Sequence, residues 1–217
     1  MSEALTSLKG YRSLRVKGEF RSDGGYNFNR VDLHVDRQGN CAGSYMPSHP
    51  PTTKFVIIGD RAWLAHDDEF LEEIRTFAKN VMPDKVAGVE EAIKRARGKY
   101  IEYSVRDLDY PSLILCDLDR LFAGVPEKVD SAEEVGNPRT KGGVRTVQLT
   151  HARGDGELAV HVPEKGKPVP RGIEFEIDGD PVLLEFEDYD EPVRVRPPRR
   201  ADTVLAEEVR GLDVLAD

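Results

Sequence analysis

The sequence has no long apolar run and relatively little positive charge. Its 217 residues contain no stretch of 18 consecutive apolar side chains, so the sequence predicts no membrane-spanning segment. Acidic residues outnumber basic ones by 40 to 31, which gives a formal net charge of −9. Because phosphate binding needs a basic surface, we expect no nucleic-acid partner. The same balance argues against electrostatic attachment to anionic lipid headgroups.

The motifs that carry enzymatic or metal chemistry are also missing. The Ser nucleophile motif GxSxG is absent, because Gly43-Ser44 is followed by Met46 where a glycine is required. The five histidines form neither HExxH nor HxH, and we expect them in ordinary surface or capping roles. The acidic stretch 67–73 lacks the spacing and the glycine of a calcium loop. We therefore expect no catalytic residue, no bound metal and no cofactor.

Cysteine is scarce. Cys41 and Cys116 are the two cysteines, and they are far apart in the chain. Two buried thiols in a cytosolic protein and one structural disulfide in an exported protein fit this count equally well. The first residues, 1–5, contain neither the basic nor the apolar region of a signal peptide. The sequence is therefore either cytosolic or begins after a removed signal.

What the sequence does contain is alternation of apolar and polar side chains with a period of two. This pattern predicts an antiparallel sheet with one face in water. Turn residues separate the segments, among them Gly24-Gly25, Arg37–Asn40, Pro50-Pro51 and Gly59-Asp60. The predicted strands are 14–20, 31–36, 41–46, 53–58, 61–65, 99–105, 144–150, 158–162, 173–177, 182–186 and 193–195.

Apolar residues at helical spacing interrupt this pattern in the middle of the chain. They predict helices over 67–82, capped by Asp67 or Asp68, and over 86–97, ending at Gly98. A short helix over 3–9 and a third central helix over 111–122 complete the set. Helices inserted into an antiparallel sheet indicate an α+β fold. We expect one domain over 1–198, a strongly curved half-barrel sheet with the helices packed on its concave face.

Residues 199–217 are predicted to be a charged tail, with a short helical stretch over 204–209 and partial disorder. The apolar stripe of helix 67–82 either simply covers the sheet or helps to enclose an apolar cavity. Side-chain phase alone selects ten candidates for the lining of such a cavity, and they are Leu14, Val16, Val31, Leu33, Phe55, Ile57, Trp63, Phe70, Ile74 and Phe77.

Several segments resemble the LolA/LppX-like lipoprotein families, and most closely the small actinobacterial lipoproteins. The similarity covers roughly residues 5–198 and consists of a pattern of hairpins. Its segments are Ser13–Gly18, Val31–Val35, Gly39–Gly43 and Phe55–Trp63, and then Gly166–Glu174, Val182–Phe186, Asp188–Val193 and Pro197.

The resemblance implies a half-barrel that binds a lipid, an acyl chain or a lipidated protein and carries it across the cell envelope. Related sensor proteins use the same shape to control an anti-sigma factor, so an envelope protein partner is the alternative. The resemblance also implies an extracytoplasmic protein whose only attachment to the membrane is a lipidated cysteine. The signal and the lipobox are absent from the sequence, and Met1-Ser2 is similar to an expression start that replaces them. Similar lipoproteins pair an early strand with the central helix through a disulfide, which implies a Cys41–Cys116 bond.

Overall fold

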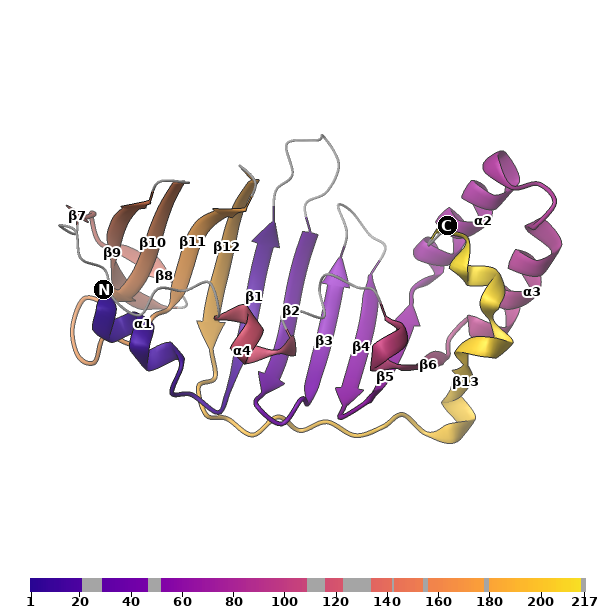
Figure 1. Cartoon of the computed structure of the whole chain (residues 1–217), viewed down its shortest axis with the longest axis horizontal. Helices are drawn as coiled ribbons and strands as arrows, with labels where there is room; N and C mark the ends of the chain where they lie inside the picture. Colours follow the sequence, from indigo (N-terminus) through magenta and orange to yellow (C-terminus); the bar gives the residue numbers. More distant parts are fainter. Residues whose placement is uncertain are drawn as a thin grey trace.

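One large sheet organises the molecule. The computed structural model describes residues 1–20, 29–46, 52–108, 116–122, 134–141, 143–153, 156–177 and 180–215. In these residues thirteen strands form a single sheet in the order β13-β6-β5-β4-β3-β2-β1-β12-β11-β10-β9-β7, with β8 paired to β9 (Figure 1). Every pairing is antiparallel except that of β13 with β6. The predicted α+β class, with an open and strongly curved sheet, is therefore confirmed.

The first half of the sheet is a meander of neighbouring hairpins. Its strands are β1 (Ser13–Phe20), β2 (Asn29–Asp36), β3 (Cys41–Met46), β4 (Thr53–Ile58) and β5 (Arg61–His66). Two of the predicted turns are confirmed, because Gly39 and Gly59 adopt φ angles of 81° and 61°, which glycine tolerates without strain. The predicted turns at 24–25 and 50–51 lie outside the described residues.

The second half of the sheet comes from the C-terminal part of the chain. Its strands are β7 (Glu134–Val135), β8 (Arg139–Lys141), β9 (Val144–Arg153), β10 (Gly156–Pro163), β11 (Gly172–Ile177) and β12 (Asp180–Glu187). The two halves meet where β1 pairs with β12, from Arg15 opposite Glu187 to Phe20 opposite Val182. The middle of the sheet therefore joins strands from opposite ends of the sequence.

Helices α1 (Ser2–Leu8), α2 (Asp68–Val81) and α3 (Val86–Ala96) match the predicted segments, as does strand β6 (Tyr100–Ser104). Asp67 is the cap of α2, because its side chain accepts a hydrogen bond of 2.9 Å from the amide of Phe70. None of the helices in the described residues is long and apolar enough to cross a membrane.

The predicted helix 111–122 is too long in its described part, although a helix is present there. Helix α4 is confined to Leu118–Leu121, and Cys116 precedes it. Asp117 has an extended backbone, and its side chain accepts hydrogen bonds from the amides of Asp119 and Arg120. It thus begins a new helix where the apolar spacing had predicted a continuous one. Residues 109–115 lie outside the described part of the chain.

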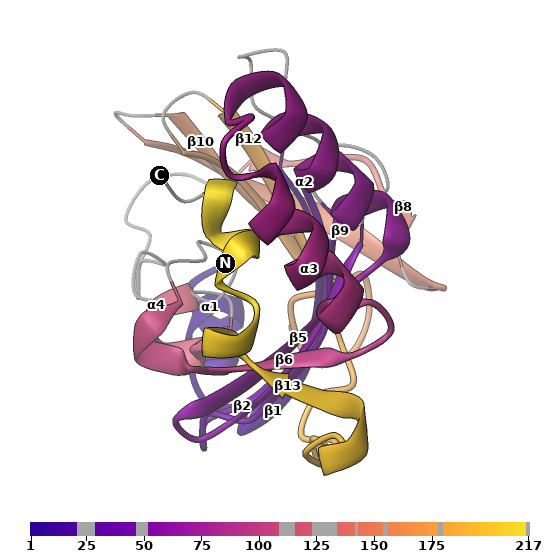
Figure 2. The same ribbon diagram turned by 90° about the vertical axis from the view of Figure 1, so that its right-hand side faces the viewer.

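The two middle helices occupy one end of the sheet rather than its centre. The chain segment that contains α2 and α3 connects β5 to β6. These two strands are neighbours near one edge of the sheet, so the two helices are held at that edge (Figure 1). They form a separate apolar cluster with Ile101 of β6 and with Val209 and Leu212 near the C-terminus. The expected packing of helices on the concave face is therefore confirmed. α1 and α4 lie over that face (Figure 2), and α2 and α3 pack at its β6 end, where Ile101 faces the same side as its cross-strand partner Leu64.

After β12 the chain runs as a strap, residues 188–202, along one rim of the sheet beneath the ends of β1 to β5 (Figure 1), and it ends in a 3-10 helix over Arg200–Asp202. The strand predicted over 193–195 is wrong, because this segment pairs with no neighbouring strand in the described residues. The helix predicted over 204–209 is also wrong. Its place is taken by β13 (Thr203–Leu205), which pairs with β6, followed by a 3-10 turn over Ala206–Glu208.

The predicted tail therefore packs against the domain over the residues that the structure describes. A second 3-10 helix, Arg210–Leu215, follows the turn and contacts α3. Val209 and Leu212 are buried in the cluster formed by α2 and α3. The boundary at residue 198 stays a prediction.

Candidate functional site

The concave face of the sheet is an unbroken apolar surface. Strand alternation turns every second side chain of the central strands toward this face, so residues of β1 to β5 and β10 to β12 meet in one cluster. All of them are at least 95% buried. The strand residues of this concave cluster are Leu14, Val16, Val31, Leu33, Val35, Cys41, Phe55, Ile57, Ala62, Leu64, Leu158, Val160, Val162, Ile173, Val182, Leu184 and Phe186.

Two short helices cover this face. α1 contributes Ala4, Leu5 and Leu8, all without exposed surface. The α4 region contributes Leu118 and Phe122, and the ring of Phe122 meets that of Phe186 edge to face at 5.7 Å. Because seven- and four-residue helices have little stability of their own, their position depends on these contacts and on what fastens them.

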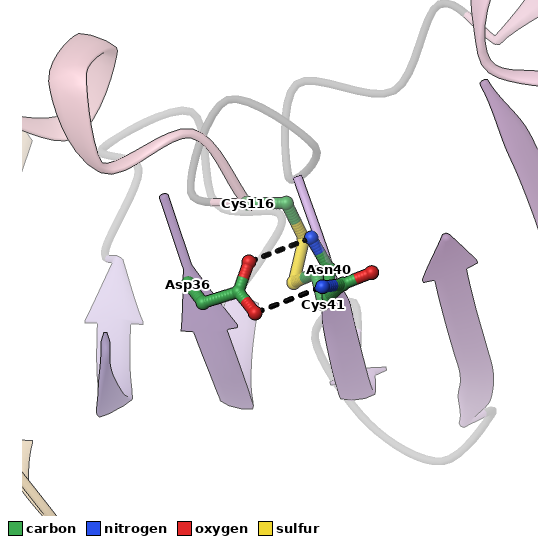
Figure 3. The surroundings of a disulfide bond; sticks show 4 residues. All are labelled: Asp36, Asn40, Cys41 and Cys116. Atoms are coloured by element: carbon green, nitrogen blue, oxygen red, sulfur yellow. Dashed lines mark hydrogen bonds between the residues drawn. A yellow bond between two sulfur atoms is a disulfide. The ribbon is translucent and has the colours of Figure 1, made fainter. Parts of the chain in front are cut away.

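A disulfide fastens the chain before α4 to the sheet. Cys41, the first residue of β3, bonds to Cys116, with Cα atoms 5.6 Å apart and 75 positions between them in the sequence (Figure 3). The preceding turn is itself held by Asp36, whose carboxylate accepts from the amide and from the side chain of Asn40 at 3.0 and 2.9 Å. The pairing implied by the resemblance is therefore present, and it attaches α4 to an ordered hairpin.

Arg37 is a second fastening that the sequence did not reveal. Its guanidinium donates to the carbonyls of Lys9 and Tyr11 at 2.5 and 2.8 Å and also pairs with Asp119 of α4. One side chain on the β2–β3 turn therefore holds the end of α1 and the start of α4 together. An arginine in a polar hairpin turn is an ordinary surface feature in sequence, so no local signal marks this role.

Six of the ten candidate lining residues gather on the concave face. They are Leu14, Val16, Val31, Leu33, Phe55 and Ile57. Ile74 lies in the α2–α3 cluster, with Phe70 and Phe77 packed partly buried against it. That these residues contact a ligand remains a prediction, and the two groups belong to different clusters.

Trp63 faces the opposite side of the sheet. Its neighbours Ala62 and Leu64 both belong to the concave cluster, so strand alternation turns the indole away from it. The indole donates to the carboxylate of Glu102 at 3.1 Å, and the guanidinium of Arg61 lies over its ring at 4.8 Å. Side-chain phase in the sequence predicted Trp63 as a lining residue, but the strand turns Ala62 and Leu64 toward this surface and Trp63 away from it.

His66 is the titratable group at the α2 edge of this face. Its Nδ1 atom lies 2.9 Å from the hydroxyl of Thr53, and its ring stacks on Phe70 at 4.3 Å. Burial lowers the pKa of His66 to about 4, because desolvation disfavours the imidazolium form. Burial also raises the pKa of Tyr45. Both side chains are therefore neutral at physiological pH, and the surface they border favours apolar contacts.

The convex face has the opposite character. Arg15 forms two bonds of 2.7 Å to Asp32, and Lys17 pairs with Glu187 at 2.7 Å. Lys17 and Asp32 also line a groove of about 540 Å³, whose lining combines charged side chains with apolar ones such as Met46 and Leu183. His161 on this side is fully buried and lies 2.6 Å from Glu174, which corrects the expected surface role.

These features define an open, strongly curved antiparallel half-barrel with an apolar concave face beneath two fastened helices. Solved structures with this fold include LprF from Mycobacterium bovis, with a TM-score of 0.60 and 15% identity over 90% of this chain and 93% of that one. The lipoprotein LppX from Mycobacterium tuberculosis has a TM-score of 0.53 and 14% identity, over 89% and 94% of the two chains. The resemblance to LppX-like lipoproteins is therefore confirmed in the fold. No family model and no curated protein sequence matches the chain.

Proposed function

We propose that this protein is an extracytoplasmic lipoprotein that binds a lipid, an acyl chain or another hydrophobic ligand on its concave face, without catalysing a reaction. The observation that carries the proposal is the continuous apolar cluster spanning eight strands of a curved sheet. Burying one methylene group against such a surface contributes about 0.8 kcal/mol. An acyl chain is therefore held without a single polar contact.

Ligand entry on this proposal requires α4 to move, because the concave side chains are covered by the protein itself. Leu14 and Val16 have no exposed surface in this conformation. The disulfide holds Cys116 against β3, while the short helix that follows it depends on Leu118, Phe122 and the Arg37 pair. We infer that α4 swings about the disulfide to admit the ligand.

The extracytoplasmic location is supported by the disulfide, because such bonds persist in oxidising compartments. The similarity of the fold to a mycobacterial lipoprotein supports the same location. On this proposal, a lipidated cysteine anchors the protein outside the cell membrane and the ligand is carried across the envelope.

The test is native mass spectrometry of protein exported by an actinobacterial host, followed by organic extraction. A reproducible extra mass that extracts as a lipid supports the proposal and identifies the class of ligand. Two leucine variants locate the binding surface in the same experiment.

Leu149 is half-buried against the concave cluster, and Leu183 is half-buried on the opposite face. Leu149→Asp should abolish the extra mass, whereas Leu183→Asp should retain it.

A second function is favoured by the covered state of the face. A protein-interaction or sensory domain on the same scaffold would have its concave face filled by its own side chains, as the burial of Leu14 and Val16 illustrates. An envelope protein would then bind elsewhere on the surface. A clean mass without ligand in exported, disulfide-bonded protein would reject the carrier and select this alternative.

A further inference from the structure

The middle of the strap, residues 192–200, concentrates positive charge, between the carboxylates of Asp188, Asp190 and Glu191 on one side and Asp202 on the other. Four arginines fall within nine residues, Pro192–Arg200, and this stretch contains no acidic residue. The surrounding chain has a large excess of carboxylates, since the whole protein carries −9. The net charge of the whole chain argues against binding to anionic lipid surfaces. Charges that lie farther than a Debye length, roughly 8 Å, from such a surface are largely screened, so the local charge decides whether a segment binds.

The local sequence determines how these arginines are displayed. Val193 and Val195 are half-buried. Arg194, which lies between them, and Arg196, which follows them, are exposed. Extended backbone alternates its side chains in this way. The proline pair that follows restricts the backbone, and Arg199 and Arg200 continue the exposed row beyond it. At about 3.3 Å per residue, Arg194 to Arg200 spans up to roughly 20 Å.

Both ends of the strap are fixed to the domain. At its start, Asp190 accepts from the amide of Arg12 at 2.8 Å, and its own amide donates to the carbonyl of Ser13 at 2.9 Å. At its end, Lys99 donates to the carbonyl of Ala201, and β13 pairs with β6. The segment that carries the arginines is therefore held along the rim from both ends.

Three of the arginines are available to a partner. Arg199 pairs with Asp202 at 2.6 Å, although its side chain is still 85% exposed. Arg194, Arg196 and Arg200 form no ion pair with any residue that the structure describes. Guanidinium groups bind phosphate oxygens through paired hydrogen bonds, and each free group supplies that geometry.

We propose that this arginine strap, residues 192–200, docks the rim of the half-barrel onto a membrane surface rich in anionic phospholipid. An exposed row of like charges along the rim matches a plane of phosphate headgroups. A protein partner is disfavoured because the centre of a protein interface is apolar, whereas the valines of the strap are turned inward. In this docked arrangement the rim contacts the bilayer, and the concave face lies next to the membrane surface. The inference does not depend on the proposed ligand.

Vesicle co-sedimentation of the full chain at low salt tests the proposal. Vesicles of phosphatidylglycerol mixed with phosphatidylcholine should bind the protein, and 0.5 M NaCl, a strongly screening concentration, should release it. Vesicles of phosphatidylcholine alone should not bind it. The variant R194Q/R196Q/R200Q should bind the anionic vesicles on the order of 100-fold more weakly, since each arginine near such a surface contributes about five-fold.

The matched control is K94Q/R95Q/R139Q, which removes the same charge from exposed positions elsewhere. It should bind as the wild type does, and circular dichroism should show both variants folded. Equal loss in both variants would overturn the proposal, as would a wild type that fails to sediment. If the wild type instead binds soluble polyglutamate through the strap and ignores the vesicles, the partner is an acidic protein. Salt-insensitive binding to phosphatidylcholine alone would indicate uptake of apolar ligand and would reject the strap as the contact.

Discussion

The sulfur atoms of Cys41 and Cys116 join the first residue of a central strand to the residue two positions before helix α4. A covalent bond thus holds a four-residue helix over the concave face. The bond also closes a loop of 75 positions, so its removal frees the unfolded chain.

We expect the double variant C41A/C116A to lose about 4 kcal/mol of unfolding free energy, the value that the chain-entropy account gives for a loop of this size. Urea unfolding at neutral pH measures it, and wild type with reductant should show the same loss. If the double variant and the reduced wild type both unfold at the wild-type midpoint, the bond has no structural role.

The variant Arg37→Met should lower the free energy of unfolding by about 2 kcal/mol, because the carbonyls of Lys9 and Tyr11 lose the guanidinium that donates to them. The variant Asp119→Ala removes only the ion pair with Arg37. Because the Asp119 side chain is 81% exposed, this variant should lower the free energy of unfolding by less than about 1 kcal/mol. Thermal or urea unfolding of the two variants compares them. Equal losses would mean that the carbonyl contacts contribute nothing beyond the ion pair.

Acid should destabilise the protein through His66. Its folded pKa of about 4 lies below the ordinary value of 6.5, so the unfolded state binds the proton more tightly. The contribution of His66 to stability is complete above pH 6.5, falls as the pH drops toward 4, and is constant below that. Because His66 is partly exposed, we expect a loss of about 2 kcal/mol across this window.

Urea unfolding at pH 4.5 and 7.5 measures the effect, with His66→Gln as the comparison. The variant should have a smaller difference between the two pH values than the wild type does. An identical difference in both proteins would assign the acid sensitivity to other groups.

Truncation after residue 198 should destabilise the domain. It removes β13 and takes the buried side chains of Val209 and Leu212 from the α2–α3 cluster. Losing two such side chains alone costs about 4 kcal/mol. A chain ending at residue 215 serves as the control in thermal unfolding. A truncated protein as stable as this control would show that the predicted boundary at 198 is the true end of the domain.

Periodicity in the sequence was sufficient to find most of the strands and three of the helices, because the sheet has one wet face and α2 and α3 have one apolar side. Periodicity failed where tertiary contacts determine the secondary structure. Val204 and Val209 share a helical spacing, yet the edge of β6 offers backbone partners that draw Thr203–Leu205 into a strand. Val193 and Val195 alternate as a strand does, but they lie at a rim where no strand edge is available.

The candidate site was predictable in its strand residues and, through the resemblance, in its disulfide, but not in the contacts of Arg37. Leu14, Val16 and Leu33 follow from alternation. Trp63 was misplaced because the phase assigned to its strand was one residue out, and Ala62 and Leu64 face the concave side instead. The role of Arg37 depends on α1, β2 and α4 meeting in space, which no local pattern encodes.

The pairing of β13 with β6 has a consequence for the order in which the molecule is completed. The outer edge of β6 is covered by Thr203–Leu205, which are synthesised about a hundred positions later in the chain. Until then, the unpaired backbone groups of β6 are open to strands of other molecules. The strap must also cross the whole first half of the sheet before β13 arrives. Pairing of Thr203–Leu205 therefore completes the sheet, and a chain cut short before residue 203 has a free strand edge that favours aggregation.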